Sequence, residues 1–306
     1  MKIISASELA ALSPYAAVIE SLREGFKSGI ETPVRHQHAT SKVSTLLLMP
    51  AWSEKWTGLK TVVVKSDNAA INLPTVQASY VLIDNATGET VALMDGTELT
   101  RRRTAAASAL AASYLARADA STLLVVGTGA LATHFVRAHA AVRPIKNVLI
   151  YNRALAKAKA LCTELAADGF EVSAVTDLEQ AARTADIISC ITTSTTAIIK
   201  GAWLKPGTHV DLAGAYKPTM RETDSEVVSR ARVYVDTREG ALSEAGDLLQ
   251  AHAEGMFDFA DVQGDLFELC SRTAVGRQTA EEITLFKSCG TAVEDLAAAV
   301  MVYLRS

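Results

Sequence analysis

The eight residues VVGTGALA, at positions 125–132, decide the fold class of this 306-residue chain. They overlap a short apolar run, Leu123–Val126, that is typical of a buried strand, and a stretch with helical character follows them. In such a G-x-G-x-x-A turn the first glycine allows a tight bend, and the second lets a pyrophosphate approach the backbone. The small final residue allows the helix to pack closely on the strand, and the helix N-terminus faces the phosphates. The segment therefore predicts a dinucleotide-binding strand–turn–helix unit rather than a tight turn that binds no ligand.

Short apolar runs and helical stretches alternate on both sides of this turn. Helices are expected from the turn to about Ala141, over Leu155–Ala167 and over Leu178–Arg183. Strands are expected at Leu123–Val126, Val148–Tyr151, Glu171–Val175, Ile187–Thr192, His209–Ala213 and Val233–Val235. Alternation at this spacing predicts an α/β fold with a doubly wound parallel sheet of the Rossmann type.

The flanking sequence has a different texture. It predicts a helix over residues 6–29, short strands between Val43 and Met94, and an alanine-rich helix over Thr104–Ala118. The stretch Thr291–Arg305 is helical again and is expected to pack on the N-terminal portion. We therefore predict a smaller α+β domain for dimerisation and substrate binding, formed by residues 1–117 and 290–306. The NAD(P)-binding Rossmann domain would span residues 118–289.

The composition excludes several classes of protein. The net charge of -4 gives no electrostatic basis for binding nucleic acid. The four cysteines lie far apart without a CxxC pair, so we expect reduced, buried thiols and no metal site. No apolar run approaches the roughly 18 residues that span a bilayer, and the N-terminus does not resemble a signal peptide. These features predict a cytoplasmic protein with neither membrane nor nucleic-acid partners.

The end of the second expected strand bears on the choice of dinucleotide. NAD-selective sites usually place Asp or Glu there to bind the ribose hydroxyls. This chain has Asn152 and Arg153, which carry no negative charge that would repel a 2′-phosphate. NADP(H) is therefore favoured, with NAD(H) as the alternative. Arg153 could also be a solvated residue that stacks on the adenine.

Three basic residues, Arg35, Lys60 and Arg103, stand in or beside apolar patterns. A guanidinium can bind a carboxylate through two hydrogen bonds, which suits a substrate clamp. Taken alone, each residue is better explained as a surface cation or a structural ion pair. Histidines show no paired metal spacing, and Ser194 lacks the sequence context of a nucleophile. The sequence leaves open whether Glu244 and Asp247 face an active site or a subunit interface.

The chain resembles the ornithine cyclodeaminase/μ-crystallin family along nearly its whole length. The segments that carry the resemblance, besides the glycine turn, are Pro33–Arg35, Leu48–Pro50, Gly58–Lys60, Leu73–Ala78, Met94–Gly96, Arg102–Ala106, Trp203–His209, Glu244–Asp247 and Phe286–Gly290. The resemblance implies a homodimer whose N-terminal domain forms the subunit interface. It also implies that the substrates are amino acids or their small cyclic imines.

The resemblance also assigns roles to individual residues. Lys60 is expected to be catalytic and to lie beside the reacting carbon of the substrate. The residues expected to bind the substrate are Arg35, Met49, Lys60 and Arg103, with the two arginines contacting its carboxylate. The residues expected to bind the cofactor are Thr75, Arg103, Thr104, Gly127, Gly129, Ala130, Leu131, Asn152, Arg153, Thr192, Thr193, Ala213 and Ser288.

One departure from the family pattern narrows the expected reaction. Cyclodeaminases place a catalytic aspartate just after the fifth Rossmann strand, where this chain has Tyr216. A neutral phenol, with a reference pKa near about 10, is a poor base at neutral pH. A cyclic imine needs no such acid, because hydride addition to its protonated C=N bond completes the reaction. The resemblance therefore predicts an NAD(P)H-dependent reductase of Δ1-pyrroline-2-carboxylate and Δ1-piperideine-2-carboxylate. Ornithine cyclodeaminase, an amino-acid dehydrogenase or opine-type synthase, and a non-catalytic crystallin-like protein are the alternatives.

Overall fold

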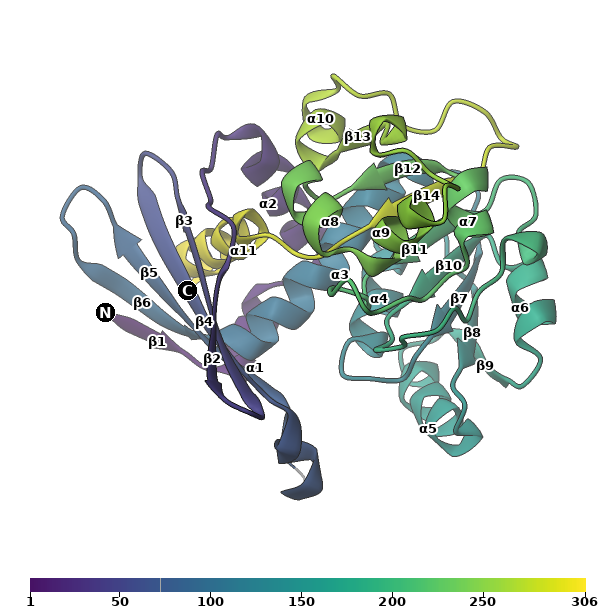
Figure 1. Ribbon diagram of the computed structural model, residues 1–306. Coiled ribbons are helices and arrows are strands. Elements are labelled where there is room, and N and C mark those ends of the chain that lie inside the picture. Colours follow the sequence, from purple (N-terminus) through teal and green to yellow (C-terminus); the bar gives the residue numbers. More distant parts are fainter. Residues whose placement is uncertain (72) are drawn as a thin grey trace. The chain divides into compact units, whose positions relative to one another are not determined.

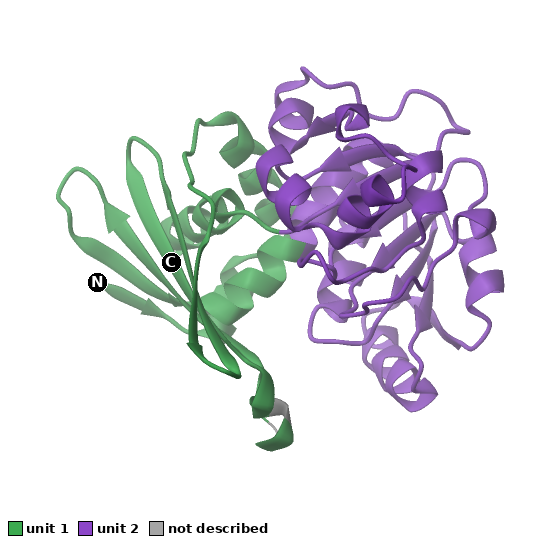
Figure 2. Ribbon diagram, in the orientation of Figure 1, with its two compact units in different colours: residues 1–104, 290–306 green, residues 105–289 purple. Residues whose placement is uncertain are grey.

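The computed structural model describes residues 1–71 and 73–306, and the chain divides into two compact units (Figures 1 and 2). The first unit contains Met1–Thr104 and Gly290–Ser306, and the second contains Ala105–Cys289. The helix α3, Gly96–Leu115, contributes residues to both units. The sequence-based division at residue 117 assigns this whole helix to the first domain, so the two divisions differ in where they place its second half.

The first unit is built around a mixed sheet. Six strands among the described residues follow the order β1-β6-β5-β4-β3-β2, with β1 parallel to β6 and the other neighbours antiparallel. Their bounds are β1 Lys2–Ile4, β2 His36–Ser41, β3 Ser44–Trp52, β4 Trp56–Lys65, β5 Val76–Asp84 and β6 Thr90–Asp95, with a 3-10 helix at Ser66–Ile71. The expected strands of this region are present, while β1 and β2 were not predicted because one is short and the other is polar and fully exposed.

The helices of the first unit pack against this sheet. The single helix predicted over residues 6–29 is wrong: α1, Ala6–Leu12, and α2, Tyr15–Lys27, are separate. Pro14 lies between them, where it lacks a backbone N–H and disfavours helical geometry in Ser13. The helix α11, Ala292–Arg305, begins at its N-cap Thr291 and packs against α2, β3 and β4, as expected from the sequence (Figure 1).

The second unit contains the predicted parallel sheet. Its strand order is β13-β12-β14-β11-β10-β7-β8-β9, and every described pairing is parallel. The strands are β7 Thr122–Val126, β8 Asn147–Tyr151, β9 Glu171–Val175, β10 Ile187–Cys190, β11 His209–Leu212, β12 Arg232–Val235, β13 Gly264–Asp265 and β14 Thr284–Lys287. Val126 pairs with Tyr151 on one side and with Cys190 on the other, so the carboxyl ends of three strands meet where the strand order reverses. In open α/β sheets ligands bind at such a point.

The helices of this unit complete the alternation. They are α4 Ala132–Ala140, α5 Leu155–Ala166, α6 Leu178–Thr184, α7 Ser225–Arg230, α8 Arg238–Glu244, α9 Gly246–Ala253 and α10 Leu266–Ser271, with 3-10 turns at Gly201–Trp203 and Phe259–Asp261. The first three were predicted from periodicity, whereas the four after residue 224 are short and were not. In the part of the chain that the structure describes, no helix is long and apolar enough to cross a membrane.

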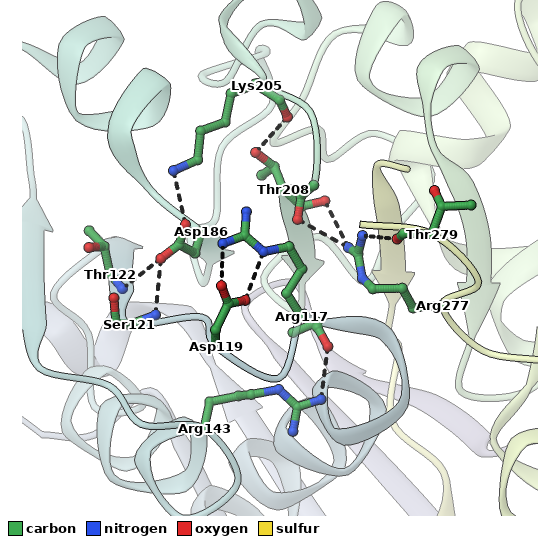
Figure 3. Close-up of polar contacts among 12 residues, drawn as sticks. Arg117, Asp119, Ser121, Thr122, Arg143, Asp186, Lys205, Thr208, Arg277 and Thr279 are labelled. Atoms are coloured by element: carbon green, nitrogen blue, oxygen red, sulfur yellow. Dashed lines mark hydrogen bonds and ion pairs between the residues drawn. The ribbon is translucent and has the colours of Figure 1, made fainter. Parts of the chain in front are cut away.

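Two arginines of the second unit donate hydrogen bonds to the backbone carbonyls at the C-terminal end of α3. The Arg143 guanidinium donates to the carbonyls of Ala112, Ser113 and Ala116 at 2.8–2.9 Å, and Arg277 Nε donates to that of Leu115 at 2.6 Å. A helix leaves its last four carbonyls unpaired, and cations there also complement its dipole. Figure 3 shows both arginines in a polar network that includes Asp186, which accepts the N–H groups at the start of β7. The amino edge of the sheet is thus held together by structural contacts.

Candidate functional site

A cleft of about 410 Å³ lies at the carboxyl edge of the parallel sheet. It is lined by the glycine turn, the end of β8 and the loop after β10. The lining residues are Val126, Gly127, Thr128, Gly129, Tyr151, Asn152, Arg153, Lys157, Ile191, Thr192, Thr193, Ser194, Thr196 and Ile198. Several residues expected to bind the cofactor therefore share one cleft, and the sequence prediction missed Lys157 and the apolar residues.

The two glycines of the turn have different physical roles. Gly127 has φ +115°, which side chains rarely adopt, and a Cβ there would lie 2.9 Å from the Ile191 carbonyl oxygen. A Cβ on Gly129 would meet no protein atom within 4 Å, so the space above that residue is open to a ligand. No side chain caps the N-terminus of α4, which follows the turn. A helix N-terminus without a side-chain cap beside an open backbone fits a pyrophosphate.

The end of β8 supplies polar and basic groups to the same cleft. The Asn152 side-chain amide donates to the Thr128 hydroxyl at 2.8 Å and so ties this strand end to the glycine turn. Arg153 and Lys157 are exposed. Arg153 follows β8, and Lys157 lies in the first turn of α5. Two cations without a lining carboxylate make this end of the cleft attractive to a phosphate.

Other residues expected to bind the cofactor lie outside the lining of this cleft. Ala130 and Leu131 lie in the turn just before α4. Ala213 follows β11 and donates its N–H to the Cys190 carbonyl at 3.0 Å. Ser288 is buried, and its hydroxyl donates to Asp236 at 3.1 Å. Their cofactor roles stay predictions.

The first unit contains a buried cluster of four charged side chains. Lys60, in the middle of β4, is 1% exposed, and its Nζ lies 2.7 Å from Asp295 Oδ1 and from Oδ2. Arg103 Nε lies 2.9 Å from the same Asp295, while Arg103 Nη1 lies 2.5 Å from Glu294. Both carboxylates are fully buried on α11. The sequence prediction named the two cations and missed the two acids.

Burial and neighbouring charges set the protonation of this cluster. Burial and the adjacent Arg103 lower the pKa of Lys60 to about 8, although Asp295 partly opposes them. Burial alone would raise the pKa of Asp295, but Lys60 and Arg103 outweigh it and hold that pKa below its ordinary value. At neutral pH the cluster therefore holds an ionised Asp295 beside a lysine whose pKa lies within about one unit of neutrality.

The other residues of the first unit that were predicted to bind substrate or cofactor differ in their burial and contacts. Met49 is buried and pairs with Lys60 across β3 and β4, so it shares the face that carries the cluster. An Arg35 Nη2 donates to the Gly290 carbonyl at 2.9 Å. The Thr104 hydroxyl donates to the Thr100 carbonyl within α3, and Thr75 is exposed before β5. The structure thus brings Met49, Lys60 and Arg103 together, and all these assignments stay predictions.

A signal in the sequence could have identified the two acids. Glu294 and Asp295 interrupt the otherwise apolar stretch AVEDLAAAV of α11, and such a stretch predicts a buried helix. Buried carboxylates need cationic or hydrogen-bonding partners. The unexplained cations Lys60 and Arg103 were the available partners, but nothing in the sequence pattern showed the pairing.

The remaining sequence candidates are also placed by the structure. Among residues 1–71 and 73–306, no three His, Cys, Asp or Glu side chains are arranged to hold a metal ion. Asp247 is buried within the second unit, and Tyr216 is half-buried in the loop after β11.

Comparisons with known proteins agree with this architecture. The family model described as "Ornithine cyclodeaminase/mu-crystallin family" matches residues 3–306. A Δ1-pyrroline-2-carboxylate reductase of Paracoccus denitrificans is 40% identical, over 91% of this chain and 88% of that relative. The structure of the Thermococcus litoralis Δ1-pyrroline-2-carboxylate reductase with NADH and L-proline has a TM-score of 0.95 and 34% identity, covering 100% of this chain and 97% of that one. The structure of an archaeal alanine dehydrogenase dimer with bound NAD has a TM-score of 0.93 and 31% identity. The match covers 99% of this chain and 95% of that one. The chain therefore belongs to the ornithine cyclodeaminase/mu-crystallin family.

Proposed function

We propose that this protein reduces the cyclic ketimines Δ1-pyrroline-2-carboxylate and Δ1-piperideine-2-carboxylate to L-proline and L-pipecolate with NAD(P)H. Two relatives named for the first of these reactions align over nearly the whole chain. The observation that carries the choice of reaction is Tyr216, which stands where cyclodeaminases of the family have an aspartate. Without that carboxylate the chain lacks the general base with which those relatives would deprotonate an amino substrate. An imine substrate requires no such deprotonation.

The buried cluster of the first unit matches the charge of such a substrate. A protonated cyclic ketimine carboxylate is a zwitterion, with a positive C=N and a negative carboxylate. Arg103 and Lys60 offer two cations for the carboxylate, and Asp295 and Glu294 offer negative charge that favours the iminium. Burial strengthens both interactions by excluding water.

Each residue has a separate task in the proposed reaction. The bound dinucleotide supplies the hydride. Arg103 binds the substrate carboxylate, and Arg35 is a second candidate for that contact. Lys60 Nζ, protonated below a pKa of about 8, donates a hydrogen bond or a proton. Asp295 holds the lysine and the arginine in one orientation.

An activity panel tests this proposal. Oxidation of NADPH and NADH should be followed with each of the two cyclic imines and with pyruvate plus ammonia, while ammonia release should be followed with ornithine. We expect rapid oxidation with the cyclic imines and no ammonia from ornithine. No turnover of either imine at millimolar concentration would exclude the proposed reaction, and ammonia release would favour the cyclodeaminase.

The cleft of the second unit favours NADP(H) over NAD(H). Arg153 and Lys157 lie on its rim, and no Asp or Glu is among the residues that line it. Both cations lie beyond the end of β8, where the adenosine ribose is held in Rossmann domains. NAD(H) remains compatible with the cleft, since solved relatives contain it.

Removal of the two cations should change the dinucleotide preference. In the double variant Arg153→Gln/Lys157→Gln, we expect NADPH to bind at least about tenfold more weakly and NADH to bind nearly unchanged, because only NADPH carries the 2′-phosphate. Fluorescence titration of both dinucleotides measures the ratio. Lys159→Gln, on the same helix but outside the cleft, is the matched control. Equal loss of both dinucleotides would contradict the assignment.

The outer face of the mixed sheet supports a homodimer. Alternation along β3 to β5 places Met49, Lys60 and Tyr80 on the buried face. The opposite face is mostly apolar, with Thr61 and Ser79 among its residues, and is only partly covered. It carries Leu46, Leu48, Pro50, Trp52, Leu59, Val63, Val81 and Leu93. A largely apolar, partly exposed sheet face of this kind marks a protein interface, and we propose a second copy of this chain as its occupant.

A charge on this face should separate the subunits. Leu59→Asp is expected to raise the dimer dissociation constant at least about 100-fold, because an unpaired buried charge costs several kcal/mol. Sedimentation velocity over a range of protein concentrations measures the change. Ala156→Asp, on an exposed position of α5, should leave the oligomeric state unchanged. An unaltered dimer in Leu59→Asp would exclude this face as the interface.

A further inference from the structure

A buried carboxylate in the second unit joins two loops at the carboxyl edge of the parallel sheet. Glu222 is fully buried, ahead of α7. Its Oε1 accepts the backbone N–H of Thr192 at 2.7 Å and the hydroxyl of the same residue at 3.0 Å. Its Oε2 accepts the N–H groups of Gly214 at 2.9 Å and Ala215 at 3.1 Å. Thr192 lines the cleft, and Gly214 and Ala215 immediately precede Tyr216.

The two loops are packed too closely to tolerate a side chain between them. A Cβ on Gly214 would collide with the backbone of Thr192 and with the Glu222 carboxylate. A Cβ on Gly246, at the start of α9, would likewise collide with the carbonyl of Met220. The segment that carries Tyr216 is therefore fixed on one side by Glu222 and on the other by α9.

Two further buried charged residues, Asp247 and Lys287, lie near Glu222. Asp247 Oδ1 accepts the backbone N–H groups of Glu222 at 2.7 Å and Thr223 at 3.0 Å. Lys287 Nζ, on β14, lies 3.3 Å from Asp247 Oδ2, and both side chains are fully buried. Burying these charges costs desolvation free energy, so their presence here is not explained by packing alone. Through Glu222, these contacts fix the positions of the Thr192 loop and the Tyr216 loop.

We propose that Glu222 is a positioning residue that holds the Thr192 loop and the Tyr216 loop in the arrangement that binds the dinucleotide. The proposal rests on the proposed function only in assigning a dinucleotide to the cleft. All four donors to Glu222 come from these two loops, and each carboxylate oxygen serves one of them. Because a carboxylate only accepts, any group that also donates at this position must lose contact with one loop.

The protonation state of Glu222 gives a readout that a merely structural role would not produce. Burial raises the pKa of Glu222 to about 7, helped by Asp247 and opposed by Lys287 and by the bonds from Thr192. Lys287 and Cys190 also face Glu222 and do not titrate in this range: the pKa of Lys287 is raised, and the pKa of the buried Cys190 thiol is raised well above its usual value. Protonation below about pH 7 turns one oxygen into a donor. Affinity for the dinucleotide should then fall as the pH falls from 8 to 6.

The variant Glu222→Gln tests the proposal, because it keeps the shape and replaces one accepting oxygen by a donating amide. We expect it to bind NADH about tenfold more weakly than the wild type at pH 8. Its affinity should no longer change between pH 6 and pH 8. NADH is the appropriate probe because it lacks the 2′-phosphate, which itself titrates near this range. Binding is measured calorimetrically without substrate, so the result does not depend on whether cyclic imines are reduced.

A matched variant and a second measurement complete the experiment. Glu239→Gln, which alters an exposed carboxylate of the same unit, should match the wild type at both pH values. Hydrogen exchange of residues 191–196 and 213–218 should accelerate in Glu222→Gln, and in the wild type when the pH is lowered, after correction for the intrinsic pH dependence. Wild-type affinity in Glu222→Gln with an unaltered pH dependence would overturn the proposal. If that variant does not fold, a wild-type affinity that stays constant from pH 6 to 8 would overturn it equally.

Discussion

Replacement of Lys60 by glutamine is expected to lower kcat/KM for Δ1-pyrroline-2-carboxylate by about 100- to 10,000-fold, the range for loss of a positioned proton donor. Lys60 is buried and contacts Asp295, so the variant removes a cation that water cannot replace. The change should appear in kcat as well as in KM, because the ammonium acts on charge that changes during hydride transfer. Steady-state kinetics with saturating dinucleotide measures both constants.

The pH profile separates a chemical role of Lys60 from a structural one. Since burial and Arg103 lower its pKa to about 8, wild-type kcat/KM should fall as the pH rises through about 8 and the ammonium is lost. Lys60→Arg keeps the charge at all these pH values, so this alkaline decline should disappear. Lys65→Gln, on the exposed part of the same strand, is the control and should behave as the wild type. Full activity in Lys60→Gln would remove this residue from the reaction.

Replacement of Asp295 by asparagine is expected to give the largest loss of stability. The variant leaves Lys60 and Arg103 without the carboxylate that both contact, and breaking a buried ion pair costs about 3–5 kcal/mol. The free energy of unfolding of the first unit should fall by that amount, and its thermal transition should fall by about 12–20 °C. Calorimetry and urea unfolding measure the change.

The stability of the wild type should also depend on the ionisation of Asp295. Because its pKa in the folded protein is held below the ordinary value, its contribution is present above the unfolded pKa and is lost as the pH falls through the folded one. Asp295→Asn should lack this part of the acid dependence. Asp67→Asn, which breaks the exposed pair with Lys65, should change stability little. Equal stability of Asp295→Asn and the wild type would show that the cluster is not a structural requirement.

The parallel sheet was largely predictable because its signals are local. The strands at Leu123–Val126 and Glu171–Val175 are short apolar or alternating runs next to helices, and they lie where the sequence placed them. The strand β14 escaped prediction because it contains Lys287, which resembles a surface residue in a four-residue run. Its ion pair with the buried Asp247 explains a lysine at that position. Strands of this kind form because of tertiary contacts, which the periodicity of the sequence does not reveal.

The candidate site shows the same limit. The glycine turn could be assigned from sequence because its residues act through their own backbone geometry and immediate neighbours. Glu222 could not, since its four donors come from residues 7 to 30 positions away and no pattern connects them. The carboxylates opposite Lys60 are still more remote, because Asp295 is 235 positions away in the chain.

That separation has a consequence for biosynthesis. At about 5–20 residues per second, a ribosome needs roughly 12–47 s to progress from Lys60 to Asp295. During this interval the lysine and Arg103 have no counter-charge from α11 and must stay hydrated, so the core of the first unit cannot close. The parallel sheet of the second unit lies within residues 105–289 and is synthesised before α11. The unit that is translated first is therefore completed last, and a nascent chain stalled before residue 294 should expose the apolar sheet to chaperones.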